Sequence, residues 1–254
     1  MIARVADVLV DLVGERPQIV LDTELRDRIH LGAREHAPQP DRQGLLGAEL
    51  ELIAGLCRDH DAIAITDEIY EHMVYDGEHK SLATVPGMAE RTITISGASK
   101  TYSVTGWRVG WLVAPPRLTD GIRKVHDFLT VGAPAPLQQA AAAGMAFGPE
   151  YYNSMAQEYR ARRDVIVEGL TEAGFAFSVP EGAYYIMADF SALSDLDDTK
   201  FSRWLATEIG VAPVPGSSFY HDGGGKTIVR FAFSKQLSTL EKASERLATI
   251  RARV

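Results

Sequence analysis

Hydrophobic positions along the first part of the chain alternate between helical spacing and the continuous runs of buried strands. Between Ala48 and Arg58 the apolar side chains recur at helical spacing, which predicts a helix. Short apolar runs rich in β-branched residues predict buried strands at 61–66, 91–96 and 110–114. Further helices are predicted at 118–129, 138–147 and 150–173. This alternation predicts an α/β protein.

The last of these helices is long and amphipathic, and its solvent face is expected to carry Arg160, Arg162, Arg163 and Asp164. After Gly174 the pattern changes to short strands and short helices. Strands are predicted at 175–179, paired with 184–189, and at 227–233; helices are predicted at 201–209 and 240–250. We therefore expect a larger sheet domain over residues 1–147, then a long interdomain helix and a smaller α+β domain over residues 148–254.

The composition and charge exclude several classes of protein. The chain has 254 residues, of which 46% are hydrophobic and 24% charged, as in an ordinary globular protein. Its formal net charge of −8 disfavours nucleic acids and anionic membranes as partners, and no apolar run is long enough to span a bilayer. The single cysteine, Cys57, excludes a disulfide framework and fits a reducing cytoplasm. The spacing of His and Cys residues matches no metal-binding motif.

Two short segments carry residues that suggest chemistry. The first runs from Gly97 to Gly110 (GASKTYSVTGWRVG), with Lys100 just after a strand end and Arg108 just before the next strand. The second is DEIY, residues 67–70, at the carboxyl end of a different strand. Ligands of α/β sheets bind beyond the carboxyl ends of strands, so both segments are placed to contact one. Taken singly, a lysine in a turn and an acid at a helix start are more often plain surface charges.

Together, the two segments resemble the class I/II aminotransferases, which are pyridoxal-phosphate enzymes of fold type I. The shared pattern is D-x-x-Y after an apolar strand, followed further along by S-K-T-Y-S-x-T-G-W-R-x-G. The resemblance continues through PEGAY (180–184), PGSSF (215–219) and IVRFAFS (228–234), and it covers residues 48–254. It implies a partial large-domain sheet with helices on both faces and a small C-terminal α+β domain.

The resemblance implies a role for each candidate residue. Lys100 would form the Schiff base with pyridoxal 5′-phosphate and move the substrate proton. Asp67 would pair with the pyridine nitrogen, and Tyr70 would hydrogen-bond the phenolic oxygen of the ring. Arg108 would bind the phosphate, and Arg230 would hold the substrate α-carboxylate through both its oxygens.

Some features depart from the family pattern or imitate other sites. The phosphate-binding serine of many family members is Gly97 here, which leaves Ser99, or alternatively Ser96, to supply a hydroxyl. The segment GGGKT (223–227) imitates the end of a phosphate loop, but it precedes a predicted strand, so we interpret it as a hairpin turn. Positions in the core, rather than cofactor contacts, are expected for Tyr184, Tyr185 and Trp204.

The N-terminal part does not match the family. Members carry a glycine-bearing helix N-terminus that binds the phosphate and an aromatic residue that stacks on the ring, and neither is found here. We therefore expect an N-terminally truncated protein that binds the cofactor weakly. The family's N-P-x-G motif is also absent. One permissible codon choice for residues 36–46, read one base later, gives TPHNPTGKVF. We hypothesise that residues 30–47 are translated out of frame, which sequencing the gene would test.

The sequence thus predicts a cytoplasmic transaminase that moves an amino group from an L-amino acid to a 2-oxo acid, with activity impaired by truncation. The segment YEHMVYDG (70–77) is most similar to the kynurenine, methionine and aromatic-type transaminases. Two alternatives remain open: a pyridoxal-phosphate C–S lyase of the same fold, and a non-catalytic fragment that only dimerises or binds a partner. The resemblance implies a homodimer in the full-length form.

Overall fold

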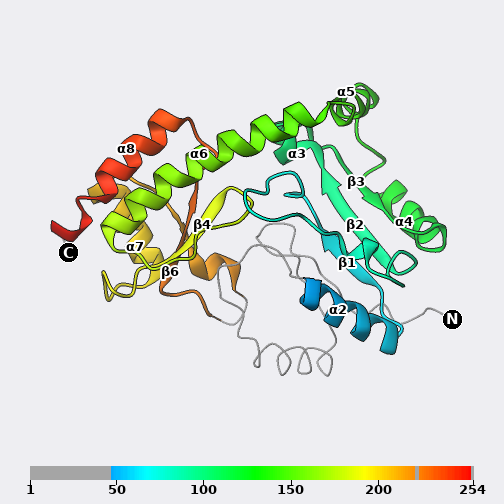
Figure 1. The fold of residues 1–254 in the computed structure, drawn as a ribbon, viewed down its shortest axis with the longest axis horizontal. Coiled ribbons are helices and arrows are strands. Elements are labelled where there is room, and N and C mark those ends of the chain that lie inside the picture. Colours follow the sequence, from blue (N-terminus) through cyan, green and yellow to red (C-terminus); the bar gives the residue numbers. More distant parts are fainter. Residues whose placement is uncertain (1–46, 221–222, 253–254) are drawn as a thin grey trace. The chain divides into compact units, whose positions relative to one another are not determined.

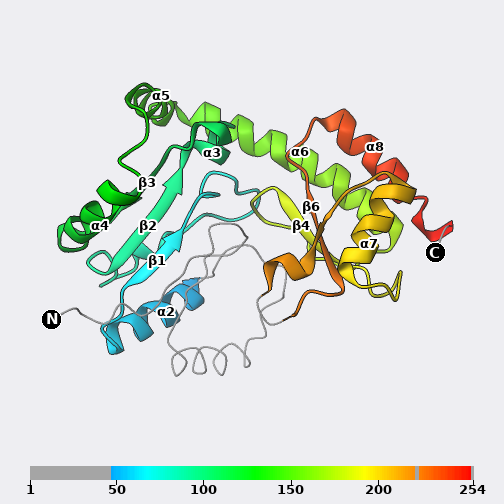
Figure 2. The same cartoon turned by 180° about the vertical axis from the view of Figure 1, so that it is seen from behind.

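The computed structural model describes residues 47–220 and 223–252, which divide into two compact units after Tyr151 (Figures 1 and 2). The division falls inside the long helix α6 (Pro149–Ala173). The sequence-based boundary at residue 147 lies close to it, and the match of these units to the two expected domains stays a prediction. Except for Gly47, the segment that we hypothesise to be out of frame lies outside the described residues.

The first unit is built on a three-stranded mixed sheet in the order β1-β2-β3. Its strands are β1 (Ala64–Asp67), β2 (Thr92–Gly97) and β3 (Gly110–Val113). β1 and β2 are parallel, and β3 is antiparallel to β2. The helices of this unit are α2 (Gly47–Asp59), α3 (Ala98–Thr101), α4 (Pro116–Leu129) and α5 (Ala135–Met145). Two 3-10 turns are η1 (Leu82–Thr84) and η2 (Thr105–Trp107).

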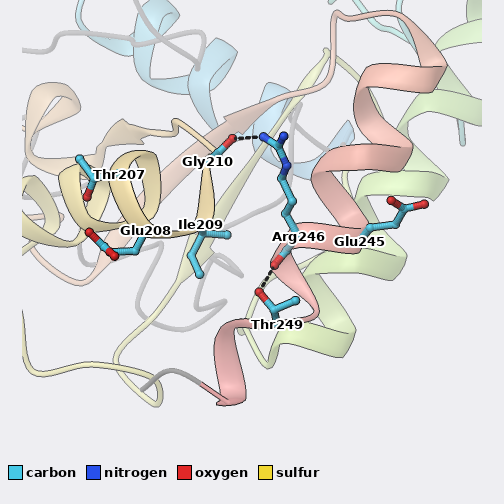
Figure 3. Close-up of a pocket in the computed structure, with 7 residues that line it drawn as sticks. All are labelled: Thr207, Glu208, Ile209, Gly210, Glu245, Arg246 and Thr249. Atoms are coloured by element: carbon cyan, nitrogen blue, oxygen red, sulfur yellow. Dashed lines mark hydrogen bonds between the residues drawn. The ribbon is translucent and has the colours of Figure 1, made fainter.

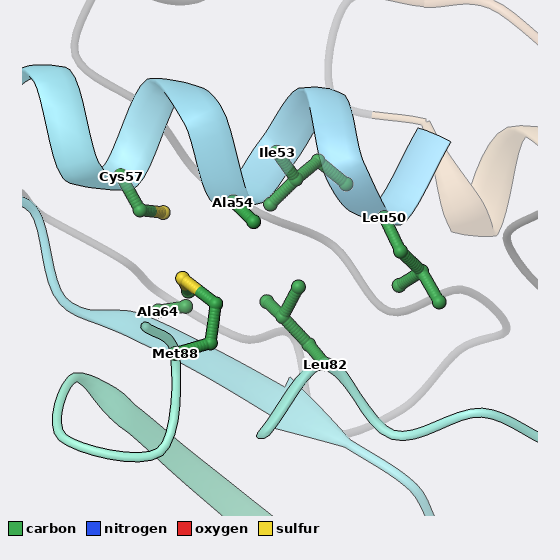
Figure 4. Close-up of a cluster of buried hydrophobic side chains, with 7 residues drawn as sticks. All are labelled: Leu50, Ile53, Ala54, Cys57, Ala64, Leu82 and Met88. Atoms are coloured by element: carbon green, nitrogen blue, oxygen red, sulfur yellow. The ribbon is translucent and has the colours of Figure 1, made fainter. Parts of the chain in front are cut away.

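A cluster of buried side chains packs α2 against β1 and the segment that follows it (Figure 4). The helix contributes its buried face because the apolar residues recur every three or four positions. The cluster consists of Leu50, Ile53, Ala54, Cys57, Ala64, Leu82 and Met88. Burial raises the pKa of the Cys57 thiol, which keeps it protonated and unreactive. The cysteine is therefore a packing residue.

The second unit contains an antiparallel sheet in the order β4-β6-β5. Its strands are β4 (Tyr185–Asp189), β5 (Val214–Pro215) and β6 (Ile228–Ala232). Its helices are α7 (Asp198–Trp204), which continues into the π-helical turn η3 (Leu205–Ile209), and α8 (Leu237–Leu247). Short 3-10 turns are η4 (Gly216–Phe219) and η5 (Ile250–Ala252). Phe190 and Phe201 stack in its core, with ring centroids 4.0 Å apart.

The mixed α/β content and most of the elements expected from the sequence are confirmed. The strand expected at 175–179 is wrong, because that segment contributes only an isolated bridge between Ala176 and Asp189. β4 instead pairs along its length with β6. Pro180 follows the apolar run closely, and its missing N–H limits strand pairing there.

The solvent-facing position expected for Arg163 on α6 is also wrong. Its side chain is buried, and its guanidinium donates to the carbonyl of Pro180 at 3.0 Å and to Asp164 at 2.9 Å. A long arginine stem packs well against apolar surface when its charged end keeps partners, and here both partners are present. Arg160 and Asp164 are exposed and Arg162 is half-buried, in line with the expectation.

Two further sequence interpretations fall in the second unit. β6 follows GGGKT directly and runs antiparallel to β5, so the glycines lie in a connection between antiparallel strands. Tyr185 is buried, whereas Tyr184 and Trp204 are half-buried, with Trp204 stacked on Phe201 at 5.7 Å. Within the described residues, no helix is both long and apolar enough to cross a membrane.

Candidate active site

The pairing of β1 with β2 brings the two predicted motifs to one edge of the sheet. The strands are parallel, and Asp67, the last residue of β1, lies beside Ile95 in β2. Strand β2 ends at Gly97, and the short helix α3, which contains Lys100, begins directly afterwards. Parallel strands have their carboxyl ends at the same edge of a sheet. Asp67 and Lys100, which lie at or just after these ends, therefore lie at the same edge.

Asp67 is half-buried and held by the backbone that follows it. Its Oδ1 atom accepts a hydrogen bond from the backbone N–H of Ile69 at 3.1 Å. Burial raises the pKa of this carboxyl group, while the Ile69 hydrogen bond and the charge of Lys100 act in the opposite direction. The positive charge of Lys100 therefore favours the anionic form of Asp67, although burial acts more strongly in the opposite direction.

Lys100 sits on a helix that is fixed from two sides. Its neighbours Ala98 and Thr101 are buried, and the Thr101 carbonyl accepts a hydrogen bond from the Tyr151 hydroxyl at 2.8 Å. Lys100 itself is half-buried. A lysine on an anchored single turn has a restricted set of positions for its amine, which suits a covalent attachment point.

Gly97 has a local structural reason to lack a side chain. A Cβ atom built there would lie 3.2 Å from the carbonyl oxygen of Val109 and 3.3 Å from the Cα of Gly110, because β2 and β3 approach closely at their glycine pair. The serine found at this position in many family members would therefore require the strands to shift slightly. Packing between β2 and β3 accounts for this departure from the family pattern.

The two serines considered in its place differ in their surroundings. The Ser96 hydroxyl is buried and donates to Glu71 at 2.8 Å, so it is already engaged. Ser99 is half-buried, and within residues 47–220 and 223–252 no hydrogen bond engages its hydroxyl. Of the two, Ser99 is the hydroxyl open to a ligand.

Arg108 is an exposed cation in a strained backbone conformation. Its φ of 54° places it in the left-handed region, which non-glycine residues adopt at a cost. Its guanidinium donates to the Thr105 carbonyl at 3.3 Å, and no carboxylate of the described residues forms an ion pair with it. An arginine held in place without a carboxylate partner is suited to an anionic ligand.

Tyr70 lies in the turn that follows Asp67 and is half-buried. Its carbonyl accepts the backbone N–H of Met73 at 2.8 Å, which closes this turn. The turn carries Tyr70 and Asp67 together at the end of β1.

A buried carboxylate next to Asp67 escaped the sequence reasoning. One oxygen of Glu68 accepts hydrogen bonds from the hydroxyls of Thr66 and Ser81, both at 2.8 Å, and the other lies 2.8 Å from His79 Nε2. We call these four residues the Glu68 clamp. In the sequence, the clamp is marked only by the spacing of His79 and Ser81. That spacing does not indicate a contact with Glu68 until the fold brings the two residues to the end of β1.

The contacts within the clamp shift the pKa values of Glu68 and His79. Burial works to raise the pKa of Glu68, but the hydrogen bonds from His79, Ser81 and Thr66 outweigh it and hold that pKa below its ordinary 4.5. The hydrogen bond to Glu68 raises the pKa of His79 above its ordinary 6.5 despite partial burial. Glu68 and His79 therefore form an ion pair near neutral pH.

These shifts predict how the clamp contributes to stability as pH changes. The raised pKa of His79 gives stability that is complete below 6.5 and lost as pH rises through the folded value. The lowered pKa of Glu68 gives stability that is present above 4.5 and lost as pH falls through its folded value. Because the His79 side chain is 35% exposed, solvent screens the pair and we expect only about 0.5–1 kcal/mol.

The measurement is urea unfolding of the chain and of His79→Gln at about pH 6 and about pH 9. The substitution should destabilise the protein more at the lower pH. In a Glu68→Gln background this difference between the two pH values should vanish. An equal loss of stability at both pH values would show that the charge of His79 is not used.

The candidate substrate residue Arg230 lies in the second unit, on β6. Its guanidinium lies over the ring of Phe219 at 4.4 Å and near the ring of Tyr185 at 5.6 Å. Arg230 is half-buried, and its Nε atom is inaccessible to solvent. The aromatic faces orient the guanidinium plane without neutralising its charge, which suits it to a carboxylate ligand. Tyr185 is thus a core residue that also contacts Arg230.

The second unit also contains a cavity, which lies apart from the predicted site residues. An open cavity of about 470 Å³ in the second unit is lined by residues of η3 and α8 and of the segments that follow them, including Gly210, Arg246 and Thr249 (Figure 3). Arg246 donates to the Gly210 carbonyl at 2.9 Å, and none of the predicted site residues lines this cavity. In residues 47–220 and 223–252, no cluster of three or more His, Cys, Asp or Glu side chains could hold a metal ion.

Asp67 and Lys100 thus follow two adjacent parallel strands at one edge of the sheet. Comparison with known proteins places the chain in a family. The model of the family "Aminotransferase class I and II" matches residues 46–247, and the chain belongs to this family. The resemblance inferred from the motifs is confirmed.

The similar proteins are aminotransferases of several kinds. The chain is 39% identical over 207 residues to the methionine aminotransferase of Escherichia coli (strain K12), covering 81% of this chain and 53% of that protein. It is 37% identical over 227 residues to the kynurenine–oxoglutarate transaminase of Dictyostelium discoideum, covering 80% and 52%.

Solved structures agree with these sequence comparisons. The crystal structure of an E. coli protein with methionine aminotransferase function matches with a TM-score of 0.77 at 37% identity, over 82% of this chain and 55% of that one. The N-succinyldiaminopimelate aminotransferase of Mycobacterium tuberculosis matches with a TM-score of 0.77 at 39% identity, over 81% and 54%. The fold type I assignment is thereby confirmed. The chain spans about half the length of the relatives it matches.

Proposed function

We propose that the protein is a pyridoxal-phosphate-dependent aminotransferase that moves an amino group from an L-amino acid to a 2-oxo acid. The observation that carries this proposal is the position of Asp67 and Lys100 at one sheet edge, from the adjacent parallel strands β1 and β2. Membership of the aminotransferase family supports it.

The donor set of the first unit fits this cofactor, which offers an aldehyde, a ring nitrogen, a phenolic oxygen and a phosphate. An amine, a carboxylate, a phenol and a guanidinium are all present at or after the ends of β1 and β2: Lys100, Asp67, Tyr70 and Arg108. When bound, the cofactor supplies a protonated ring that accepts the electron pair released at the substrate Cα. Protein side chains would supply the base, the charge that holds the ring proton and the groups that bind the phosphate.

Lys100 provides the attachment point and then the base. Its amine, held on the anchored helix α3, would hold the cofactor and would act as the base that takes the proton from the substrate Cα. Asp67 in its anionic form would hold the proton on the ring nitrogen, and its half-buried setting would strengthen that interaction. Burial raises the pKa of Asp67, and the N–H of Ile69 and the charge of Lys100 offset this effect only in part.

Two more residues complete the proposed cofactor site. Arg108 would pair with the phosphate, for which its exposed guanidinium has no competing carboxylate in the described residues. The Tyr70 hydroxyl would donate a hydrogen bond to the ring oxygen, and Ser99 would supply a hydroxyl to the phosphate. These assignments rest on the position of each residue at the sheet edge and on the family pattern.

Arg230 is proposed to bind the substrate α-carboxylate. Arg230→Ala should raise the KM for amino-acid and 2-oxo-acid substrates about 10–100-fold, since a hydrogen bond to a charged group is worth about 1.5–3 kcal/mol. Cofactor affinity should not change. Steady-state kinetics and cofactor titration measure both, with the exposed Arg203→Ala as the matched control. Unchanged KM values for carboxylate substrates would refute this role.

The substrates are proposed to be those of the methionine and kynurenine type, because relatives with these names match the chain at 37–39% identity. The deciding experiment supplies methionine or kynurenine with 2-oxoglutarate and follows the formation of glutamate. Release of pyruvate and a thiol from a cysteine conjugate, without amino transfer, would instead indicate the C–S lyase. Absence of both reactions with bound cofactor would favour a non-catalytic protein.

We also infer a homodimer and a cytoplasmic location. Four apolar side chains on α4 and just after it are largely exposed in the isolated chain: Val125, Phe128, Leu129 and Val131. Such a patch is typical of a surface that another chain covers. Sedimentation velocity tests the dimer, and a monomer would contradict it. The single buried cysteine supports a reducing compartment, which fractionation of cells would test.

A further inference from the structure

The two faces of β1 have different roles at its carboxyl end. Along the strand, Ala64 and Thr66 are buried whereas Ile65 and Asp67 are half-buried, and Glu68 continues the alternation as a buried residue. The backbone N–H of Glu68 still bonds to the carbonyl of Ile95 at 2.8 Å, so the strand geometry persists to this residue. Side chains alternate across a strand, which places Glu68 on the face opposite Asp67.

The Glu68 carboxylate ties this end of β1 to a distant segment. It joins Thr66 on the strand to His79 and Ser81, and Ser81 in turn caps η1 by accepting the N–H of Ala83 at 3.3 Å. The next residue, Leu82, is buried in the cluster with α2. The clamp therefore connects the end of β1 to the buried cluster between α2 and β1.

Stability alone is a weak reason for such an arrangement. Removing a carboxylate from water carries a large desolvation cost, and apolar residues of similar size are often at least as stabilising. What a hydrogen-bonded carboxylate adds is a fixed direction, because each oxygen is held by a separate donor. The residue that gains from this fixed direction is Asp67, which directly precedes Glu68 in the chain.

We propose that Glu68 is a positioning residue for Asp67: by locking the opposite face of β1 to His79 and Ser81, it fixes the direction in which the Asp67 carboxylate leaves the sheet edge. This inference rests on the proposed function of Asp67 as the partner of the cofactor ring nitrogen. His79 has a second effect, since its proton offsets the Glu68 charge that otherwise opposes ionisation of Asp67.

Few charged groups influence Asp67 and His79 in the first unit. In the first unit, His79 is influenced by Glu68 and by Glu71, and Asp67 by Lys100 and by Glu68. Deprotonation of His79 would leave Glu68 uncompensated, which disfavours the charged form of Asp67. The clamp thus couples His79 to Asp67 through Glu68.

A first experiment needs no cofactor. The N–H of Ile69, which donates to Asp67 Oδ1, reports the direction of that carboxylate through its hydrogen-exchange rate. Glu68→Ala should accelerate exchange at Ile69 about tenfold, while the N–H of Ala64, at the other end of β1, stays protected. The exposed Glu78→Ala serves as the matched control, and Glu68→Gln, which keeps acceptor and shape, should restore much of the protection.

If Glu68→Ala does not fold, Ser81→Ala, which removes one donor, takes its place and should give a smaller acceleration at the same amide. Normal exchange at Ile69 in a folded variant that lacks the Glu68 contacts would overturn the proposal. Acceleration spread evenly over β1 would overturn it as well, because that is the result of general loosening.

A second experiment adds pyridoxal phosphate and records the absorbance of the bound cofactor against pH. In Glu68→Ala the cofactor should still attach to Lys100, but the pH at which the band changes should shift from that of the unmodified chain. An identical pH profile would contradict the positioning role. If the unmodified chain shows no attachment at Lys100, the proposed function fails, whereas exchange at Ile69 still decides whether Glu68 positions Asp67.

Discussion

Lys100→Ala should abolish covalent attachment of pyridoxal phosphate and reduce transamination about 10⁴-fold or more, because both the attachment point and the base are lost. No neighbour can replace it, since α3 presents a single lysine at the sheet edge. The measurements are the absorbance of the mixture of protein and cofactor, and glutamate formation from 2-oxoglutarate. Both should be made at saturating cofactor, so that weak binding does not imitate loss of the lysine.

The matched control is Lys124→Ala, which removes an exposed lysine from α4 and should leave both readouts unchanged. An intermediate variant, Lys100→Arg, keeps the positive charge near Asp67 but cannot form the covalent bond. Substantial turnover in either Lys100 variant would show that another group moves the proton.

Asp67→Asn should leave the fold and the attachment at Lys100 intact but lower kcat about 10²–10³-fold. An amide cannot hold the proton on the ring nitrogen by charge, and the loss of one such preorganised interaction costs about 2.7–4 kcal/mol at the transition state. Amides and carboxylates are similar in shape, so the hydrogen bond from Ile69 can remain. Steady-state kinetics measures the effect, with Asp120→Asn on the exposed side of α4 as control.

The kinetics of Asp67→Asn show whether the charge of this carboxylate is needed for catalysis. If the variant keeps normal kcat, the carboxylate is not the partner of the ring nitrogen, and the sheet-edge site must be reassigned. If it loses attachment at Lys100 altogether, Asp67 acts on the resting position of the lysine through the charge coupling between the two groups.

The candidate site could be predicted from the sequence because its signals are local. Asp67 and Lys100 each follow an apolar strand, and parallel pairing of those strands is enough to bring both to one edge. The Glu68 clamp could not be predicted, because it depends on the segment 79–81 folding back beneath β1. No periodicity along the chain carries that information.

The errors in the fold have the same cause. The segment 175–179 has the composition of a strand, but only Ala176 bridges to β4, whose other edge pairs with β6. Arginine is usually a surface residue, but the guanidinium of Arg163 has a buried partner, the carbonyl of Pro180. In both cases a tertiary contact overrides a preference that is correct on average.

The most direct test of the central claim is to locate the covalent bond to the cofactor. The chain is mixed with pyridoxal phosphate, reduced with borohydride, digested and mapped by mass spectrometry. We expect the label on Lys100 at a far higher level than on the exposed Lys80 or Lys124. Label confined to another lysine, or spread evenly over the exposed ones, would contradict it.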